Sequence, residues 1–143
     1  MERLERIEAR NAVEDLIHRY AQLVRYDRGE ETANLYVCDG VFEVRLGRPD
    51  RPEYTVQSRV EGREEIRAFL LPLKGKPHPV PLVSNILVDV DGDRAIATCV
   101  MEGRPSEGAG GFWGEYRDTC VRVDGRWHFA SRIYTIFVDP SAV

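Results

Sequence analysis

Asp27 is the residue of this 143-residue chain whose position most suggests acid-base chemistry. It follows Tyr20 by seven residues, close to two helical turns, in a stretch whose apolar residues recur at helical spacing. If the helix continues that far, the carboxylate shares the buried face and must be paired, raised in pKa or placed in a hydrated pocket. The last two states predict a general base, Asp27, acting near neutral pH. The alternative is that Asp27 has left the helix and caps the turn at Gly29 in solvent.

Two further side chains have the chemistry to assist such a base. Tyr20 lies on the inward helical face, where its phenol either polarises a substrate oxygen or forms one hydrogen bond in an ordinary core. Tyr26 can act in the same way only if the helix unwinds before it. Arg132 is a possible anchor for an anionic substrate group or for Asp27, and a structural ion pair with Asp118 is an equally simple alternative.

The remaining candidates for substrate contact lie on predicted strands. Asn85 and Tyr116 each share a strand face with small or polar residues, which suits either a pocket wall or the solvated side of a sheet. Phe112 and Trp113 follow two glycines, so they either close over a bound ring or begin the next strand and pack. We therefore take all four as candidate substrate-binding residues.

Three helices are predicted in the first half of the chain and four long strands in the second. The helices cover residues 4–26, 30–36 and 62–71, and two strands over 41–46 and 54–60 come between them. Residues 74–81 hold three prolines and are predicted to be irregular. The later strands cover 83–90, 94–101, 114–123 and 126–138, and the glycine-rich segment 102–111 is a possible flap.

This order predicts a single α+β domain over residues 1–143, with the helices on one face of a curved antiparallel sheet. The net charge of −4 comes from 24 acidic and 20 basic residues without a basic stripe, so we expect no nucleic-acid partner. There is no apolar run of about 20 residues and no apolar leader, so we expect no membrane association and a cytoplasmic location.

Cysteine and histidine usage argues against a metal or a disulfide framework. The three cysteines lack short paired spacing, and the three histidines lie far apart in the chain. No glycine-rich phosphate loop and no nucleophile elbow is present. We therefore expect no metal and no cofactor.

Several local patterns, taken in order, resemble the SnoaL-like branch of the nuclear transport factor 2 superfamily, the branch of scytalone dehydratase and hexachlorocyclohexane dehydrochlorinase. They are the helix 9–21, Asp27, the strand Val83-Ser84-Asn85, the hairpin 88–95, Tyr116-Arg117-Asp118, Asp124-Gly125-Arg126-Trp127 and Arg132. The resemblance implies a cone-shaped, cystatin-like α+β barrel around a pocket for a small organic molecule. It fits a superfold that hosts both enzymes and binding modules.

The resemblance also implies a role for Asp27, because SnoaL-like enzymes pair an aspartate at this position with a histidine that helps to remove a substrate proton. That histidine stands three or four residues before the asparagine that matches Asn85, where this chain has Pro81 and Leu82. The usual pair is therefore absent. His78 is the nearest histidine in sequence, and it is either a substitute or an exposed loop residue.

Two functions follow as hypotheses. The first is a cofactor-free lyase, isomerase or cyclase acting on a hydrophobic cyclic or aromatic substrate, with Asp27 as base and Tyr20, Tyr116, Arg132 or His78 positioning and polarising. The second is a non-catalytic carrier or assembly module of the same fold. Relatives commonly pair through the open face of the sheet, so we expect a homodimer or a higher homo-oligomer.

Overall fold

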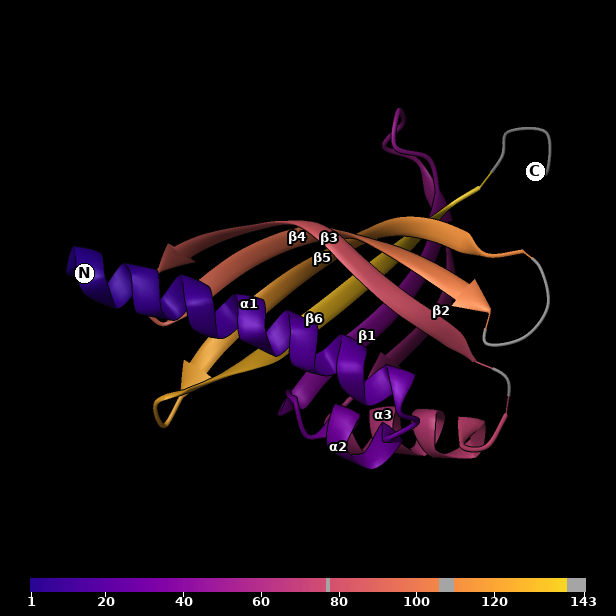
Figure 1. The fold of residues 1–143 in the computed structure, drawn as a ribbon, viewed down its shortest axis with the longest axis horizontal. Coiled ribbons are helices and arrows are strands. Elements are labelled where there is room, and N and C mark those ends of the chain that lie inside the picture. Colours follow the sequence, from indigo (N-terminus) through magenta and orange to yellow (C-terminus); the bar gives the residue numbers. More distant parts are fainter. Residues whose placement is uncertain (77, 106–109, 139–143) are drawn as a thin grey trace.

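Three helices pack against one six-stranded sheet in the computed structural model, which describes residues 1–76, 78–105 and 110–138 (Figure 1). The helices are α1 (Arg3–Arg25), α2 (Gly29–Ala33) and α3 (Arg63–Leu70), and a short 3-10 turn, η1 (Leu71–Leu73), follows α3. The strands are β1 (Tyr36–Gly47), β2 (Tyr54–Glu61), β3 (Pro79–Asp91), β4 (Arg94–Pro105), β5 (Phe112–Val123) and β6 (Arg126–Phe137). No helix in the described parts of the chain is long and apolar enough to cross a bilayer.

The strands lie in the order β2-β1-β6-β5-β4-β3, and the sheet does not close. All neighbours are antiparallel except β1 and β6, which pair in parallel. The predicted α+β fold is thus confirmed, with a mixed sheet. Figure 1 shows α1 running along one face of the sheet, with α2 and α3 gathered near its C-terminal end.

Alternating burial separates an inner and an outer face of the sheet. On β4, the inward residues Ala95, Ala97 and Cys99 are buried, and they alternate with Ile96, whose side chain is exposed. The apolar face of α1 packs against the inner face and contributes Ala9, Val13, Leu16, Ile17 and Tyr20 to the core. Small inward side chains on β4 allow close packing beneath the helix.

Two strands begin several residues earlier than the sequence predicts, and β5 begins two residues earlier, at Phe112. β1 starts at Tyr36, inside the predicted second helix, although its regular pairing with β6 begins at Val41 as expected. β3 starts at Pro79, inside the segment that the prolines were expected to keep irregular. The physical reason is that β3 is an edge strand, where a proline is tolerated because its missing N–H faces no partner strand.

Two bulges change which residues face inward. Asn85 has a φ of 54°, in the left-handed region, and the β3–β4 register shifts between Ser84 and Leu87. Asparagine tolerates this conformation better than most residues, and the extra residue lets Val83 and Ile86 both reach the core. A second shift lies between β5 and β6, where Cys120 pairs with Phe129. Because of this bulge, Phe129 is buried although it lies three residues before Arg132, the next buried residue of β6.

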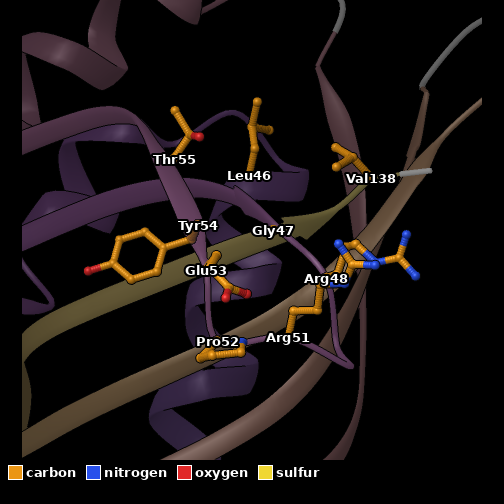
Figure 2. A pocket seen from close by; sticks show the side chains of 9 residues that line it. All are labelled: Leu46, Gly47, Arg48, Arg51, Pro52, Glu53, Tyr54, Thr55 and Val138. Atoms are coloured by element: carbon orange, nitrogen blue, oxygen red, sulfur yellow. The ribbon is translucent and has the colours of Figure 1, made fainter. Parts of the chain in front are cut away.

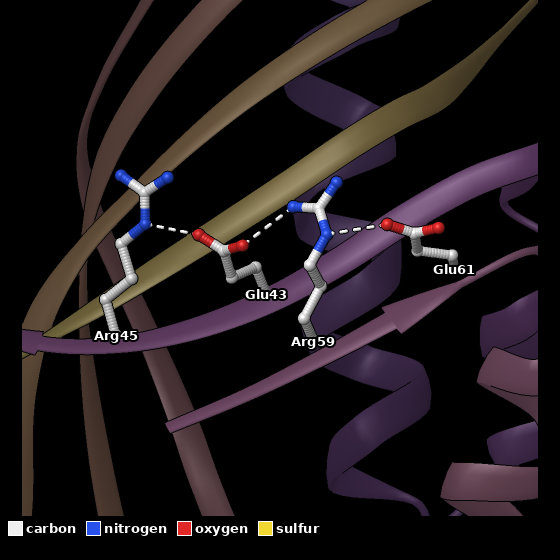
Figure 3. Close-up of polar contacts among 4 residues, drawn as sticks. All are labelled: Glu43, Arg45, Arg59 and Glu61. Atoms are coloured by element: carbon white, nitrogen blue, oxygen red, sulfur yellow. Dashed lines mark hydrogen bonds and ion pairs between the residues drawn. The ribbon is translucent and has the colours of Figure 1, made fainter. Parts of the chain in front are cut away.

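An alternating charge network holds β2 to β1 on the outer face of the sheet (Figure 3). Glu43 is 3% exposed and accepts hydrogen bonds from Arg45 and, at 2.7 Å, from Arg59, which also donates to Glu61 at 2.8 Å. Burial alone would raise the pKa of Glu43, but the hydrogen bonds from Arg59 and Arg45 hold it below its ordinary value. Glu43 and Arg59 are direct register partners, so the network stabilises this pairing.

Candidate functional site

An apolar cavity of about 240 Å³ lies on the inner side of the sheet, between α1, the α3–η1 segment and five strands. Its lining is made of aliphatic, aromatic, methionine and proline side chains, and the only polar side-chain atoms in it belong to three tyrosines. The lining residues are Tyr20, Ala21, Val24, Phe42, Val44, Phe69, Leu70, Leu73, Pro79, Pro81, Val83, Met101, Phe112, Tyr116, Tyr134 and Ile136. This composition is typical of a small-molecule site.

Burial distinguishes the floor of the cavity from its mouth. The floor is formed by side chains that are buried, among them Tyr20, Tyr116 and Tyr134. At the other end, Phe69 and Leu73 are 39% and 44% exposed. The cavity therefore opens where α3, η1 and the start of β3 meet.

Two of the three phenols already have partners in the protein. The Tyr20 and Tyr36 hydroxyls are 3.0 Å apart and share a hydrogen bond, and the Tyr134 hydroxyl donates to the carbonyl of Met101 at 2.9 Å. Within the described ranges, no hydrogen bond involves the hydroxyl of Tyr116. Among the lining phenols, Tyr116 is thus the one without a hydrogen-bond partner in the described parts of the chain.

The electrostatics of the floor keep Tyr116 protonated. Burial raises the pKa of Tyr116 far above its ordinary value, and the nearby Arg132 charge opposes this shift only in part. The same is true of Tyr20, whose pKa burial also raises. At neutral pH these groups are therefore hydrogen-bond donors and not bases.

Arg132 lies behind the floor and is surrounded by aromatic rings. Its guanidinium carbon is 3.6 Å from the ring centroid of Tyr116, 4.3 Å from that of Tyr20 and 4.4 Å from that of Phe129. Its Nε and Nη2 donate to the two carboxylate oxygens of Asp118 at 2.8 and 3.1 Å. Arg132 does not line the cavity. Of the alternatives that the sequence left open, the structure shows the ion pair with Asp118.

Both members of this pair are removed from water, with Arg132 1% exposed and Asp118 0%. Burial works against a charged guanidinium, but the charge of Asp118 and its hydrogen bonds with Arg132 more than offset this effect, so the pKa of Arg132 lies well above its ordinary value. The guanidinium therefore stays charged, and its two-pronged geometry matches an ionised carboxylate.

Asp27 stands outside the cavity lining. α1 ends at Arg25, and Asp27 follows with a φ of 61°, the left-handed conformation that commonly ends a helix. Its half-buried carboxylate accepts the backbone N–H of Gly75 at 2.5 Å. It therefore lines a neighbouring polar cleft of about 340 Å³, together with residues that include Glu30 and Lys74.

His78 lies at the same end of α1. Its Nδ1 is 3.0 Å from the carbonyl oxygen of Lys76, and its Nε2 is 3.2 Å from that of Arg25. The pKa of His78 is raised, mainly by the hydrogen bond to the Lys76 carbonyl. The hydrogen bond to Arg25 and the charge of Asp27 contribute less. The structure thus places Asp27 and His78 at the same end of α1, and His78 directly precedes Pro79, a lining residue of the cavity.

The other predicted residues divide between the cavity and the surface. Phe112 lines the cavity, whereas its neighbour Trp113 is 48% exposed and packs edge-to-face on Phe137 with a centroid distance of 4.9 Å. Tyr26 is 64% exposed beyond the end of α1. Asn85 is exposed because the bulge places it there. Trp113, Tyr26 and Asn85 are therefore not among the residues that line this cavity.

Two tyrosines at the floor or directly behind it were not among the predicted site residues. Tyr134 lies on the same predicted strand as Arg132, two residues on, and strand alternation alone could have added it to the site. Tyr36 was assigned to a helix, and only the long-range pairing of β1 with β6 brings it to Tyr20. Among the residues that the structure describes, no group of three histidine, cysteine or carboxylate side chains is placed to hold a metal.

A second concavity lies near the β1–β2 hairpin and has a volume of about 710 Å³ (Figure 2). It is an open groove lined by Leu46, Gly47, Arg48, Arg51, Pro52, Glu53, Tyr54, Thr55 and Val138. Figure 2 shows the side chains of Arg48, Arg51 and Glu53 spread along the hairpin loop, and Arg48 already pairs with Asp50 at 2.9 Å. Charged side chains contribute to the lining of this groove but not to that of the inner cavity, so the inner cavity is the better match for a small apolar molecule.

Comparisons with known proteins agree with this architecture. The model of the SnoaL-like domain family matches residues 5–133. No curated protein matches the chain in sequence. Among solved structures, an NTF2-like protein with a cystatin-like fold from Novosphingobium aromaticivorans is 25% identical over 98% of this chain and 88% of its own, with a TM-score of 0.73.

Two further solved structures are similar to this chain. A candidate scytalone dehydratase from the same organism is 25% identical over 93% of this chain and 87% of its own, with a TM-score of 0.73. A protein of unknown function from Mycobacterium tuberculosis is 24% identical over 96% of this chain and 76% of its own, with a TM-score of 0.81. At this level of identity the last comparison shows the fold alone.

Replacing Arg132 with methionine tests the buried ion pair. We expect Arg132→Met to lower the free energy of unfolding by about 3–5 kcal/mol, because Asp118 is then buried without a partner. The double variant Asp118→Leu/Arg132→Met removes both charges and should regain most of that loss. Urea denaturation followed by tryptophan fluorescence measures both. Equal losses in the single and double variants would contradict the assigned pairing.

Proposed function

Because this chain belongs to the SnoaL-like family, we propose that its apolar cavity binds a small organic molecule and that the Tyr116 hydroxyl donates the orienting hydrogen bond. The observation that carries the proposal is a phenol without a protein partner on the buried floor of an otherwise apolar cavity. A hydrogen bond gained inside such a site favours ligands with an acceptor over purely apolar ones.

Tyr116→Phe tests this assignment with a matched pair of ligands, acetophenone and ethylbenzene, which share a ring and a two-carbon chain and differ in one carbonyl oxygen. We expect the variant to bind acetophenone about threefold to tenfold more weakly, as the loss of one net hydrogen bond predicts, and to bind ethylbenzene as the parent protein does. Isothermal titration calorimetry gives both affinities.

Tyr134→Phe is the control, because Tyr134 also lines the cavity but its hydroxyl already donates to the Met101 carbonyl. It should leave the preference for acetophenone over ethylbenzene unchanged. The assignment fails if Tyr116→Phe weakens both ligands equally, and the binding proposal fails if neither ligand binds the parent protein at millimolar concentration.

A second candidate function, acid-base catalysis without a cofactor, is favoured by the location of Asp27 and His78. Both lie at the end of α1, His78 directly before Pro79 of the cavity mouth, and the Asp27 charge raises the pKa of His78. In this proposal the substrate oxygen binds Tyr116, and the carboxylate takes a proton from a carbon nearer the mouth, as elimination, isomerisation and cyclisation all require.

Proton abstraction can be measured without knowing the natural substrate. We expect the protein to accelerate deuterium exchange of the methyl protons of acetophenone in heavy water, measured by proton NMR. Asp27→Asn should reduce this acceleration by about 10²-fold to 10⁴-fold, the usual contribution of a positioned base. Glu30→Gln, in the same polar cleft, is the control and should exchange as the parent does. An unchanged rate in Asp27→Asn would remove Asp27 from the mechanism.

The outer face of the sheet supports a further proposal, pairing of two copies of the chain. Exposed apolar side chains occur on this face, including Leu87 (73% exposed), Ile96 (44%) and Trp113 (48%). Apolar patches exposed in this way commonly mark association surfaces, and a two-fold pairing places the same patch on both partners. An assembly role without chemistry would use the same face.

Light scattering at micromolar concentration tests the pairing. We expect a particle of twice the chain mass of 16.3 kDa. Ile96→Lys should convert it to a single chain, because a charge on each copy would be buried at the contact. Leu4→Lys, at an exposed position near the start of α1, serves as the control and should leave the mass unchanged. A monomeric parent protein would overturn the proposal.

A further inference from the structure

Because Gly103 has no side chain, the ring of Phe112, one of the residues that line the cavity, can lie over it. It is a buried residue of β4, between Pro81 on β3 and Phe112 on β5, its register partners in the two neighbouring strands. A Cβ built on Gly103 would lie 2.3 Å from Cζ of Phe112 and 2.7 Å from each Cε. No real carbon atoms approach so closely without a bond, so the Phe112 ring occupies the place of the missing side chain.

This placement bears on the size of the cavity, because Phe112 is one of its lining residues. The ring lies against the β4 backbone on one side and meets the Tyr134 ring at a centroid distance of 6.1 Å on another. The space next to it is the cavity itself. Any side chain at Gly103 would therefore drive the ring toward the volume that a ligand occupies.

The charge of the ligand is limited by the lining. None of the lining side chains is ionised at neutral pH, and the nearest buried cation, Arg132, is already paired with Asp118. A charged ligand would be buried without a counterion, which is costly. An uncharged ligand with one acceptor oxygen matches the single unpartnered phenol, Tyr116.

The size of the ligand follows from the volume. A cavity of about 150 Å³ in another protein binds benzene, which has six non-hydrogen atoms. In the same proportion, a cavity of about 240 Å³ accommodates a ligand of about ten non-hydrogen atoms. That number matches one ring with a short substituent, and two fused rings that carry a side chain exceed it.

We propose that the cavity selects an uncharged, single-ring compound with one acceptor oxygen, and that Gly103 and Phe112 together set this size limit. The proposal rests on the proposed binding function and adds to it the class of ligand and the residues that decide between one ring and two. Gly103 acts through Phe112, so it is a positioning residue without ligand contact of its own.

Two aryl ketones of different size, acetophenone and 2-acetylnaphthalene, test the size limit by calorimetry. The parent protein should bind acetophenone and bind the larger ketone at least about tenfold more weakly. Phe112→Ala should reverse this preference because it removes the ring. Gly103→Ala should weaken acetophenone by at least about tenfold, and Gly103→Ala/Phe112→Ala should bind the larger ketone as Phe112→Ala does, since the added methyl group then has no ring to displace.

Xenon titration followed by NMR gives a second readout that needs no organic ligand, because xenon fills empty apolar cavities. Its binding should be strongest in Phe112→Ala, intermediate in the parent and weakest in Gly103→Ala. If this order holds and neither ketone binds, the binding function fails while the size assignment stands. If the ketones bind with the same ranking in every variant, or the xenon order is absent, the size assignment is overturned.

Discussion

The buried ion pair between Arg132 and Asp118 constrains the whole inner end of this fold. An ionised side chain removed from water costs several kcal/mol unless a partner with good geometry faces it. Asp118 on β5 and Arg132 on β6 meet this requirement because they are direct register partners in adjacent strands. If one strand slipped by one residue, one of the two charges would face the opposite side of the sheet. The ion pair therefore opposes such a slip between β5 and β6.

The register that the ion pair requires also positions the cavity floor. With Asp118 opposite Arg132, Tyr116 falls opposite Tyr134, and the two rings meet at a centroid distance of 4.8 Å. The guanidinium also makes a cation–π contact with the ring of Tyr20 on α1. Such a contact is stronger in a site without water. Helix and sheet are thereby joined around one cation, which leaves the Tyr116 hydroxyl at the floor of the cavity.

Local sequence patterns were sufficient for those parts of the fold that depend on neighbours in the chain. The period of apolar residues predicted α1, and Asp124-Gly125, both with positive φ, marks the hairpin between β5 and β6 as expected. Long-range pairing has no comparable local signal. The parallel contact of β1 with β6 and the bulge at Asn85 depend on distant strands, and these decide that Tyr36 faces inward and Asn85 outward.

The same limit applies to the site. Helical and strand alternation led to Tyr20 and Tyr116, because each lies within a regular element, whereas alternation could not tell whether Arg132 meets Asp118 or a ligand. The relation of Asp27 to His78 depends on a left-handed turn after α1 and on the segment around Gly75, neither of which has a period. Phe112 was a candidate by its glycine neighbours, but the glycine that matters, Gly103, lies on the next strand.

Charged groups and the apolar cavity lie in different parts of this molecule. The two proposed functions, binding and catalysis, therefore depend on different residues. A carboxylate on the cavity floor would face the same desolvation cost that Asp118 avoids through Arg132, so an ionised base is stable only near water. Asp27 and His78 lie outside the cavity lining at the end of α1, where backbone groups of Gly75, Lys76 and Arg25 bind them. In the proposed reaction, the carbon that loses a proton therefore lies on the solvent side of the ligand, and the adjacent oxygen points toward Tyr116.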